Sequence, residues 1–530
     1  MDVSGENLPD DVVELKRLVV SLQSETSVLR NEKNALTEML RLLRAQLFGR
    51  KSEKLSAEEL RQSRLFNEIE AELAKGPELF SNEPEVSVPE HSRKKRGRKP
   101  LPDDLPRKEI IHDLSDEEKV CGCGAELVRI GEETAEKLDL IPPQVIVEKH
   151  IRPKYACKNC EGLHAVDGKA IKIAPLEPQI LPKSLATPGL LAQLLTGKFC
   201  DSLPFYRTER ILERFGIELS RATMCNWAVK VHERCSRLLE LLKAEMLKKP
   251  VLHCDETTLQ VLNEPGKSNT STSYMWLFRG GTRDGPVVSA DPPVVWFEYR
   301  NSRSGDFLGE FLYGYRGPFV TDGYVGYDAF GAGDGMVHAG CWAHARRPFF
   351  ELKKIAPDSE AAAHALDTIG KLYKIEREAR KLKLDADQTQ RLRQQHSRPI
   401  VKDFHAWLKQ TELETPPKSK LGRAVSYVLG QWSKLEAFLE NGHIPIDNNL
   451  AENEIRSFVV GRKNWLFSAS TAGAAASAAL YTLIANAKAA GLEPYWYLRF
   501  LFEGLAYARN DDDLWTLLPQ NVTPDELDGP

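Results

Sequence analysis

The sequence predicts a multidomain protein of the α+β class. Three observations lead to this expectation: leucines recur every seventh residue near the N-terminus, cysteines occur in two close pairs, and three acidic motifs lie between positions 253 and 452. At 530 residues the chain is long enough for several domains. We expect a coiled coil, a cysteine-rich module, a helical domain, and an α/β core that an α-helical insertion interrupts.

Composition excludes several classes of protein. Hydrophobic residues make up 42% and charged residues 28% of the chain, which suits an ordinary soluble core. No apolar run is long enough to cross a bilayer, and the N-terminus lacks the apolar block of a secretion signal. We therefore expect a cytoplasmic protein with no membrane partner. The net charge of −4 carries no global mark of nucleic-acid binding.

Residues 10–50 are expected to form a leucine-zipper coiled coil. The leucines of the repeat are Leu15, Leu22, Leu29, Leu36 and Leu43. The other seam position holds Val19, Thr26, Lys33, Leu40 and Leu47. A strict seven-residue period favours a coiled coil over a single amphipathic helix packed on the body of the protein. A coiled coil in turn predicts a homo-oligomer.

A charged linker with a basic tract is expected over residues 51–105. Within it, Arg96 and Arg98 flank Gly97 in a pattern that resembles an AT-hook. In such a segment, glycine lets the backbone lie deep in the minor groove of DNA while arginines follow its negative potential. The alternative is a solvated charged linker.

Residues 106–172 are expected to form a zinc-ribbon-like module. Its four ligands would be Cys121, Cys123, Cys157 and Cys160. Two thiolate pairs brought together by a β-hairpin suit tetrahedral, structural Zn²⁺, and the alternating segment 145–151 predicts one strand. Free thiols or a redox pair remain the alternative. Nine cysteines do not indicate a disulfide framework. We expect ordinary buried thiols at Cys200, Cys225, Cys235 and Cys254.

A helix-turn-helix is expected within a helical domain over 180–248. Apolar residues recur at helical spacing over 205–215, Gly216 ends that helix, and Ser220 caps a second helix over 221–230. In a DNA complex the side chains facing the bases would be Arg221, Thr223 and Asn226. A plain helical hairpin has the same pattern.

The region 249–350 is expected to be the first part of a ribonuclease-H-like core. Strands are predicted over 251–261, 273–278, 294–300 and 318–322, with a helix over 305–313. Asp255 falls in the first strand and Asp322 ends the fourth, so adjacent parallel strands would bring them together. Two Mg²⁺ ions held by such carboxylates can assist phosphodiester exchange. The third carboxylate is Glu452 or Glu454, which helical spacing alone does not separate.

Several motifs together resemble those of IS66-family transposases. They are 253–257 (His-Cys-Asp-Glu-Thr), 321–327, 341–347, 447–452 (Asp-Asn-Asn-Leu-Ala-Glu) and 461–467. The resemblance implies a DDE-type transposase of an insertion sequence with Asp255, Asp322 and Glu452 as catalytic residues and ligands of two Mg²⁺ (or Mn²⁺) ions. It implies double-stranded DNA as partner, at terminal inverted repeats and target sites, accessory proteins of the same element, and a nucleoid-associated bacterial location. Asn453 and the segment 468–470 depart from the family pattern and put DNA contacts in doubt.

The remaining segments are expected to support this core. An α-helical insertion over 351–445 precedes the second part of the core over 446–505, with a helix over 472–490, and a tail over 506–530. Further DNA contacts are expected from Arg346, Arg347, Arg462, Lys463 and Trp465, although Trp465 also suits a core position. The spacing of Cys341 and His344, with His338 nearby, fits a metal site or a thiol and an imidazole bonded within the fold.

Two other functions fit the same sequence. A DNA-binding regulator would use the zipper, the cysteine module and the helix-turn-helix without chemistry. A ribonuclease-H-like nuclease would cut DNA without joining it.

Overall fold

The computed structural model describes residues 145–156, 171–281 and 292–527, together with helical residues between positions 11 and 33. In that N-terminal helix, Val19, Leu22 and Leu29 are about half exposed. The seam positions 15, 36, 40, 43 and 47 lie outside the described residues, as does the basic tract with Arg96 and Arg98.

The chain divides into two compact units, one of 82–177 with 528–530 and one of 1–81 with 178–527. In the smaller unit, strands β1 (Lys154–Ala156) and β2 (Ile171–Ile173) pair antiparallel, with Tyr155 opposite Lys172. The predicted strand over 145–151 is wrong: those residues are exposed and irregular, since alternation alone does not supply the partner strand that a sheet requires. The four paired cysteines lie outside the described residues.

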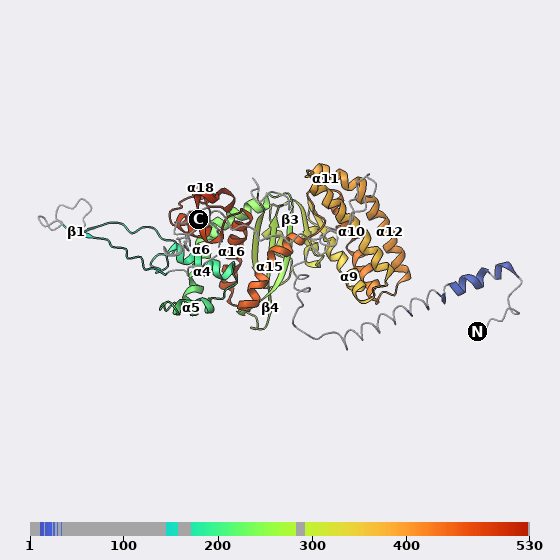
Figure 1. Cartoon of the computed structure of the whole chain (residues 1–530), viewed down its shortest axis with the longest axis horizontal. Coiled ribbons are helices and arrows are strands. Elements are labelled where there is room, and N and C mark those ends of the chain that lie inside the picture. Colours follow the sequence, from blue (N-terminus) through green and yellow to red (C-terminus); the bar gives the residue numbers. More distant parts are fainter. Residues whose placement is uncertain are drawn as a thin grey trace, which may run out of the picture. The chain divides into compact units, whose positions relative to one another are not determined.

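The larger unit is built on a sheet with the strand order β5–β4–β3–β6–β7 (Figure 1). Its strands are β3 (Leu252–Asn263), β4 (Thr272–Gly280), β5 (Val294–Arg300), β6 (Gly317–Thr321) and β7 (Met336–Gly340). The first three form an antiparallel meander, whereas β6 is parallel to β3 and β7 is parallel to β6. The predicted strands thus exist within two residues of the expected bounds.

Strand β3 has an open stretch on one edge. Along its other edge it pairs with β4 over most of its length, whereas β6 pairs only with Leu252 and His253 and β8 (Ser468–Ser470) only with Val261 and Asn263. Within the part of the chain that the structure describes, no strand pairs with the intervening residues 254–260 on that side. Helix α15 (Asn449–Trp465) packs on β3 and supplies hydrogen-bond donors to it.

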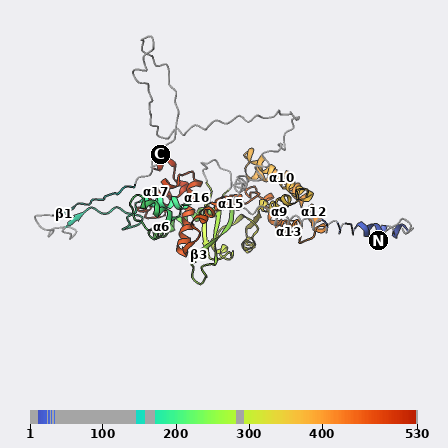
Figure 2. The ribbon, with the colours of Figure 1, turned by 60° about the horizontal axis from the view of Figure 1, so that its bottom comes forward.

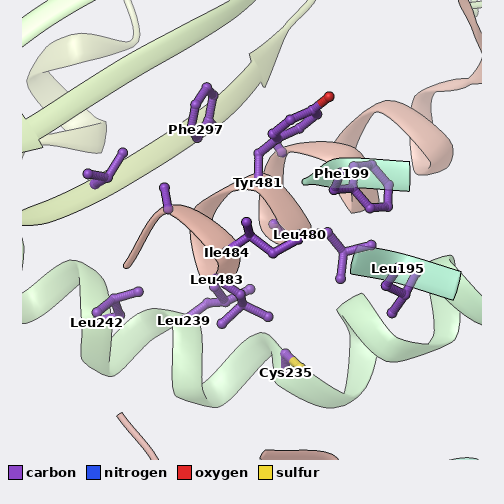
Figure 3. Packing of buried hydrophobic residues seen from close by; sticks show 14 of the residues in the cluster. Leu195, Phe199, Cys235, Leu239, Leu242, Phe297, Leu480, Tyr481, Leu483 and Ile484 are labelled. Carbon is purple, nitrogen blue, oxygen red and sulfur yellow. The ribbon is translucent and has the colours of Figure 1, made fainter. Parts of the chain in front are cut away.

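A helical layer buries the meander. It contains α4 (Pro188–Phe199), α5 (Phe205–Glu213), α6 (Arg221–Leu247), α16 (Thr471–Ala489) and α17 (Pro494–Leu505). Helix α16 lies between β5 and α6, so that Tyr481 meets Phe297 on one side and Leu483 and Ile484 meet Leu239 on the other (Figure 3). Helix α6 is much longer than the predicted 221–230, because its apolar spacing continues from Val231 to Met246.

A second group of helices follows β7 (Figure 2). Their apolar side chains pack in a second core that also contains Val320 of β6 and Ala339 of β7. It contains α9 (Trp342–Ile355), α10 (Glu360–Lys381), α11 (Ala386–Leu392), α12 (Arg398–Glu414), α13 (Lys420–Gly430) and α14 (Trp432–Glu436). Trp342 lies at its centre, fully buried, and donates from Nε1 to the Leu435 carbonyl oxygen at 2.8 Å. The first residues of α9 therefore connect this core to the sheet.

Short elements complete the fold. They are α7 (Leu308–Phe311), α8 (Asp328–Gly331), α18 (Asp511–Thr516), the 3₁₀ turns Val325–Tyr327, Ala437–Leu439, Pro519–Asn521 and Pro524–Glu526, and a π turn at Arg393–Ser397. The helix predicted over 305–313 is thus confined to four residues. Gly305 lies too close to the Gly326 carbonyl for a Cβ, which explains the small residue there. In the part of the chain described, no helix combines the length and apolarity needed to span a bilayer.

The edge strand β5 is covered by side chains instead of another strand. Asn486 of α16 accepts a hydrogen bond from the Val295 backbone N–H at 3.0 Å and donates one to the Val295 carbonyl at 2.6 Å. Thr482 accepts from the Phe297 backbone N–H at 2.9 Å. These contacts blunt an edge that otherwise offers unpaired backbone groups.

The Asn486→Ala variant is expected to lower the free energy of unfolding by about 2–3 kcal/mol, because it leaves two buried backbone groups of Val295 without partners. Denaturant unfolding monitored by circular dichroism measures this loss. Asn269→Ala, at an exposed position, is the matched control. Equal unfolding midpoints for the two variants would contradict the role assigned to Asn486.

Candidate active site

Three neighbouring strands bring Asp255, Asp322 and Cys341 to one level of the sheet. His253 of β3 is opposite Val320 of β6, and Thr321 of β6 is opposite Gly340 of β7. Continuing both registers places Asp255 beside Asp322 and Asp322 beside Cys341. Because β6 and β7 are parallel and end here, their following loops and helix α9 converge at this edge, the usual place for a site in such sheets.

The Asp255 carboxyl group lies in an unfavourable electrostatic environment. Burial raises its pKa well above the ordinary value, and repulsion from Glu256, Glu452 and Asp322 raises it further. A hydrogen bond from the Glu256 backbone N–H to Oδ1, at 2.9 Å, opposes this shift. The two other predicted carboxylates therefore lie close enough to Asp255 to repel it.

Glu452 occupies the first turn of α15 and is only 8% exposed. Burial raises the pKa of its carboxyl group to about 7, with Arg347 lowering it and Asp447 and Asp322 raising it. Its Oε1 atom is buried and accepts no hydrogen bond. Glu454, which spacing alone could not separate from Glu452, instead faces Arg279 of β4 at 3.8 Å.

Asn448 joins the start of α15 to β3. Its Nδ2 donates to the Cys254 carbonyl at 2.8 Å, and its Oδ1 accepts from His253 Nδ1 at 3.1 Å. Its backbone N–H donates to Cys341 Sγ at 3.2 Å. All four residues are buried, and burial lowers the pKa of His253 to about 3, so its ring is neutral. Asn448 is the N-cap residue of α15, but its side chain bonds β3 and makes no capping hydrogen bond to the helix.

The loop after β6 holds Asp322 in a tight turn. The Tyr324 backbone N–H donates to Asp322 Oδ1 at 2.9 Å, and the Tyr427 hydroxyl donates to the Asp322 carbonyl at 3.0 Å. Gly323 has φ of +96°, a left-handed conformation that favours glycine. A Cβ at that position would also press on Gln431 and Tyr427. The turn therefore fixes the backbone that carries the Asp322 carboxylate.

Glu256 and Arg303 form a part of the site that the sequence analysis missed. The Tyr327 hydroxyl donates to Glu256 Oε2 at 2.6 Å, and Arg303 Nε donates to Oε1 at 2.8 Å. The Arg303 guanidinium also lies over the Tyr324 ring, 3.8 Å from its centre. The one signal in the sequence that could have pointed to Glu256 is its position directly after Asp255. Alternation along β3 directs these two side chains to opposite faces of the sheet.

Cys341, His344 and Glu452 cluster beside Asp322. Their ligand atoms lie within 4.8 Å of one another, and His344 Nδ1 is 3.4 Å from Glu452 Oε1. Burial raises the pKa of the Cys341 thiol and lowers that of His344 to about 4. His338 is not in the cluster, since its Nε2 is 2.8 Å from Thr321 Oγ1. His338 is close to Cys341 and His344 in sequence, but in the fold it lies outside their cluster.

A pocket of about 380 Å³ opens at this level of the sheet. Its walls are Arg303, Asp322, Gly323, Tyr324, His344, Arg347, Pro348, Glu351 and Tyr427. Two arginines and one predicted catalytic carboxylate thus face the same hollow. Such a lining suits a phosphate-bearing substrate held by cations beside a metal-binding carboxylate.

The other residues expected to contact DNA lie in different settings. Arg221 and Asn226 are exposed on α6, whereas Thr223 is half-buried beside Ser220, which caps the helix. Lys463 is exposed and Arg346 is buried.

Two residues near the end of α15 are engaged within the chain. Arg462 donates to the hydroxyls of Thr257 and Thr258 at 3.1 and 3.0 Å. Trp465 packs edge-on against Phe458 at 5.4 Å, with Lys198 over its ring. The Arg462 contacts hold α15 on β3, whereas Trp465 packs within α15 and against Lys198 of α4.

Of the four cysteines that were expected to be buried thiols, two are buried and two are not. Cys235 and Cys254 are buried, but Cys225 is exposed and Cys200 is half-buried. The surface of α6 carries Cys225 on the side away from its apolar stripe.

The Asn448→Ala variant is expected to lose about 2–4 kcal/mol of unfolding free energy, because His253 and the Cys254 carbonyl lose their buried partner. It should also bind divalent metal more weakly, since α15 carries Glu452. Thermal unfolding with and without Mg²⁺ measures both effects. Asn453→Ala, exposed on the same helix, is the control. A loss no larger than that of the control would contradict the role of Asn448.

Family models match most of the chain. The model described as "Transposase IS66 family" matches residues 183–476, more than half of the chain, and the IS66 C-terminal element matches 482–520. The "zinc-finger binding domain of transposase IS66" matches 118–161, which contains all four paired cysteines. A further model, "Transposase C of IS166 homeodomain", matches 35–110. These matches indicate DNA as a partner, zinc binding in the cysteine module and divalent metal use in the core.

Full-length relatives occur in Sinorhizobium fredii (strain NBRC 101917 / NGR234). The uncharacterized protein y4jD is 31% identical over 99% of this chain and 99% of its own length. The uncharacterized proteins y4qI and y4hP are 30% and 29% identical over 98% and 88% of this chain. The chain therefore belongs to the IS66 family of transposases.

Proposed function

We propose that the protein binds the terminal inverted repeats of an insertion sequence and catalyses Mg²⁺-dependent DNA strand cleavage and strand transfer. The observation that carries this proposal is that Asp255 on β3, Asp322 at the end of the neighbouring strand β6 and Glu452 on α15, which packs on β3, lie close enough for the last two to raise the pKa of Asp255.

The donor set fits divalent metal. Buried carboxylates that repel one another are unfavourable unless a cation compensates their charge, and Glu452 Oε1 has no hydrogen-bond donor of its own. Oxygen ligands from few carboxylates are the arrangement that Mg²⁺ prefers, and Mn²⁺ accepts the same ligands. Asp255, Asp322 and Glu452 would hold the ions. Bound there, the ions would stabilise the attacking and leaving oxygens of phosphodiester exchange.

The chain's own residues hold and orient the DNA. Arg347 and Arg303 line the pocket that contains Asp322, and we assign them to the phosphate next to the reacting bond. Glu256 and Tyr324 keep the Arg303 guanidinium in place. The turn at Gly323 fixes Asp322, and Asn448 fixes the start of the helix that carries Glu452. These positioned groups would supply most of the catalytic effect, because preorganised charge acts without reorganisation.

We also propose that the core is ribonuclease-H-like. An antiparallel three-strand meander followed by two parallel strands on the side of its first strand supports this, as does the placement of Asp255 in the first strand. The helices after β7 would be the insertion that separates Asp322 from Glu452.

The N-terminal half would recognise DNA and join subunits. The cysteines at 121, 123, 157 and 160 are proposed to hold structural zinc, and the capped start of α6 offers exposed Arg221 and Asn226 to DNA. Exposed Val19, Leu22 and Leu29 on one helix support a homo-oligomeric zipper. We also propose that accessory proteins of the same element are partners of this protein.

The Asp255→Asn, Asp322→Asn and Glu452→Gln variants are each expected to lower strand cleavage and transfer at least 10³-fold, since each removes a metal-binding charge. Gel assays with terminal-repeat DNA and Mg²⁺ measure this, and band shifts should show DNA binding nearly unchanged. Glu454→Gln, which faces Arg279, is the matched control. Cut ends without joined product would favour a nuclease, and no product from the parent protein would favour a regulator. Equal loss of DNA binding would contradict a catalytic role.

In the absence of metal, Asp255→Asn is expected to raise the free energy of unfolding at pH 7–8 by about 0.5–2 kcal/mol. The raised pKa of Asp255 means that folding is penalised once pH exceeds the ordinary value for an aspartate, and a neutral amide removes this penalty. Calorimetry in EDTA measures the gain, and added Mg²⁺ should stabilise the parent more than the variant. A variant less stable than the parent in EDTA would be inconsistent with electrostatic strain at this site.

A further inference from the structure

We propose that Cys341, His344 and Glu452 form a second metal site, selective for a borderline-soft divalent ion such as Zn²⁺, and that zinc bound there inhibits DNA cleavage. The inhibitory part rests on the proposed function, because it needs Glu452 to serve the Mg²⁺ site. Binding itself does not depend on it.

The distance between His344 Nδ1 and Glu452 Oε1 fits two ligands of one zinc ion. The atoms are 3.4 Å apart. Usual Zn–N and Zn–O bond lengths in tetrahedral geometry separate two such ligands by about 3.4 Å. Both atoms are buried, and neither has a hydrogen-bond partner. Two buried polar atoms that face each other without bonding lack a group between them, and a cation satisfies both.

Cys341 supplies the ligand that selects the metal. Its Sγ lies within 4.8 Å of the other two atoms, and a shift of about 1 Å would reach the spacing of about 3.5 Å expected around zinc. Thiolate and imidazole favour Zn²⁺ over Mg²⁺, which prefers oxygen ligands and retains its waters. On binding, the thiol would release its proton to solvent.

The surroundings of the cluster leave one coordination position open. Cys341 directly follows β7 and His344 lies in the first turn of α9, so two rigid elements set their spacing. His344 lines the pocket beside Asp322. Three protein ligands next to a pocket leave the fourth position to water, as in zinc sites that are not purely structural.

Sharing of Glu452 makes the two metals compete. A carboxylate oxygen held by zinc beside His344 is withdrawn from the Mg²⁺ site formed with Asp255 and Asp322. Zinc would therefore reduce cleavage even though the cysteine module remains loaded and DNA still binds.

Isothermal titration of the full chain with Zn²⁺, starting from protein whose cysteine module is already zinc-loaded, tests the site. The parent is expected to bind one more zinc ion than Cys341→Ser and His344→Gln. Cys225→Ser, which removes an exposed thiol, should match the parent. Circular dichroism establishes that each variant is folded. The same number of zinc ions in the parent and in both cluster variants would overturn the site.

Cleavage of terminal-repeat DNA at fixed Mg²⁺ tests the inhibition. The zinc concentration that halves cleavage should be at least tenfold higher for Cys341→Ser than for the parent and for Cys225→Ser. Equal values would overturn the inhibitory role while leaving the binding result to stand. If the parent cleaved no DNA at all, the proposed function would fail, and the titration would still decide the metal site.

Discussion

The seating of α15 on the open stretch of β3 is the interaction on which the rest of the site depends. Asn448 bonds the Cys254 carbonyl at one end, and Arg462 bonds Thr257 and Thr258 at the other. Between these two attachments Glu452 is held over the level of Asp255. Residues almost 200 positions apart in sequence are thereby aligned by hydrogen bonds to a strand that would otherwise have unsatisfied backbone groups. The helical group after β7 is accommodated without disturbing this alignment, since it packs around Trp342 in a second core.

The residues around the site stabilise it, whereas the carboxylates inside it are in an unfavourable electrostatic environment. Its shell contains neutral His253, the Gly323 turn, and the Glu256–Arg303 pair, each attached to the fold by at least one hydrogen bond. Its interior contains carboxylates whose pKa values are raised by burial and by one another. Such an arrangement costs stability in the absence of a cation, and it is a reason to regard the cluster as functional. The same buried interior brings Cys341 and His344 close to Glu452. Metals of different softness would therefore compete for the Glu452 side chain.

Much of this architecture could be predicted from sequence, and the failures have physical causes. The strands of the core were predicted to within two residues of their bounds, and Gly216 and Ser220 marked the turn between α5 and α6. Segment 145–151 alternates like a strand, but no strand among the described residues pairs with it, and it is irregular. Helical spacing did not separate Glu452 from Glu454, and the family resemblance alone selected Glu452; the contact of Glu454 with Arg279 is a tertiary one that no local pattern encodes. Glu256 and Asn448 act through partners distant in sequence, which no local pattern encodes. The catalytic roles of Asp255, Asp322 and Glu452 remain predictions.

The central claim is that these three carboxylates together hold divalent metal. Anomalous diffraction from crystals of the full chain with terminal-repeat DNA, soaked in Mn²⁺, tests it directly. The account predicts manganese density in contact with Asp255 and with at least one of Asp322 and Glu452, and loss of that density in Asp255→Asn crystals. Ordered manganese elsewhere with none at these carboxylates would contradict it.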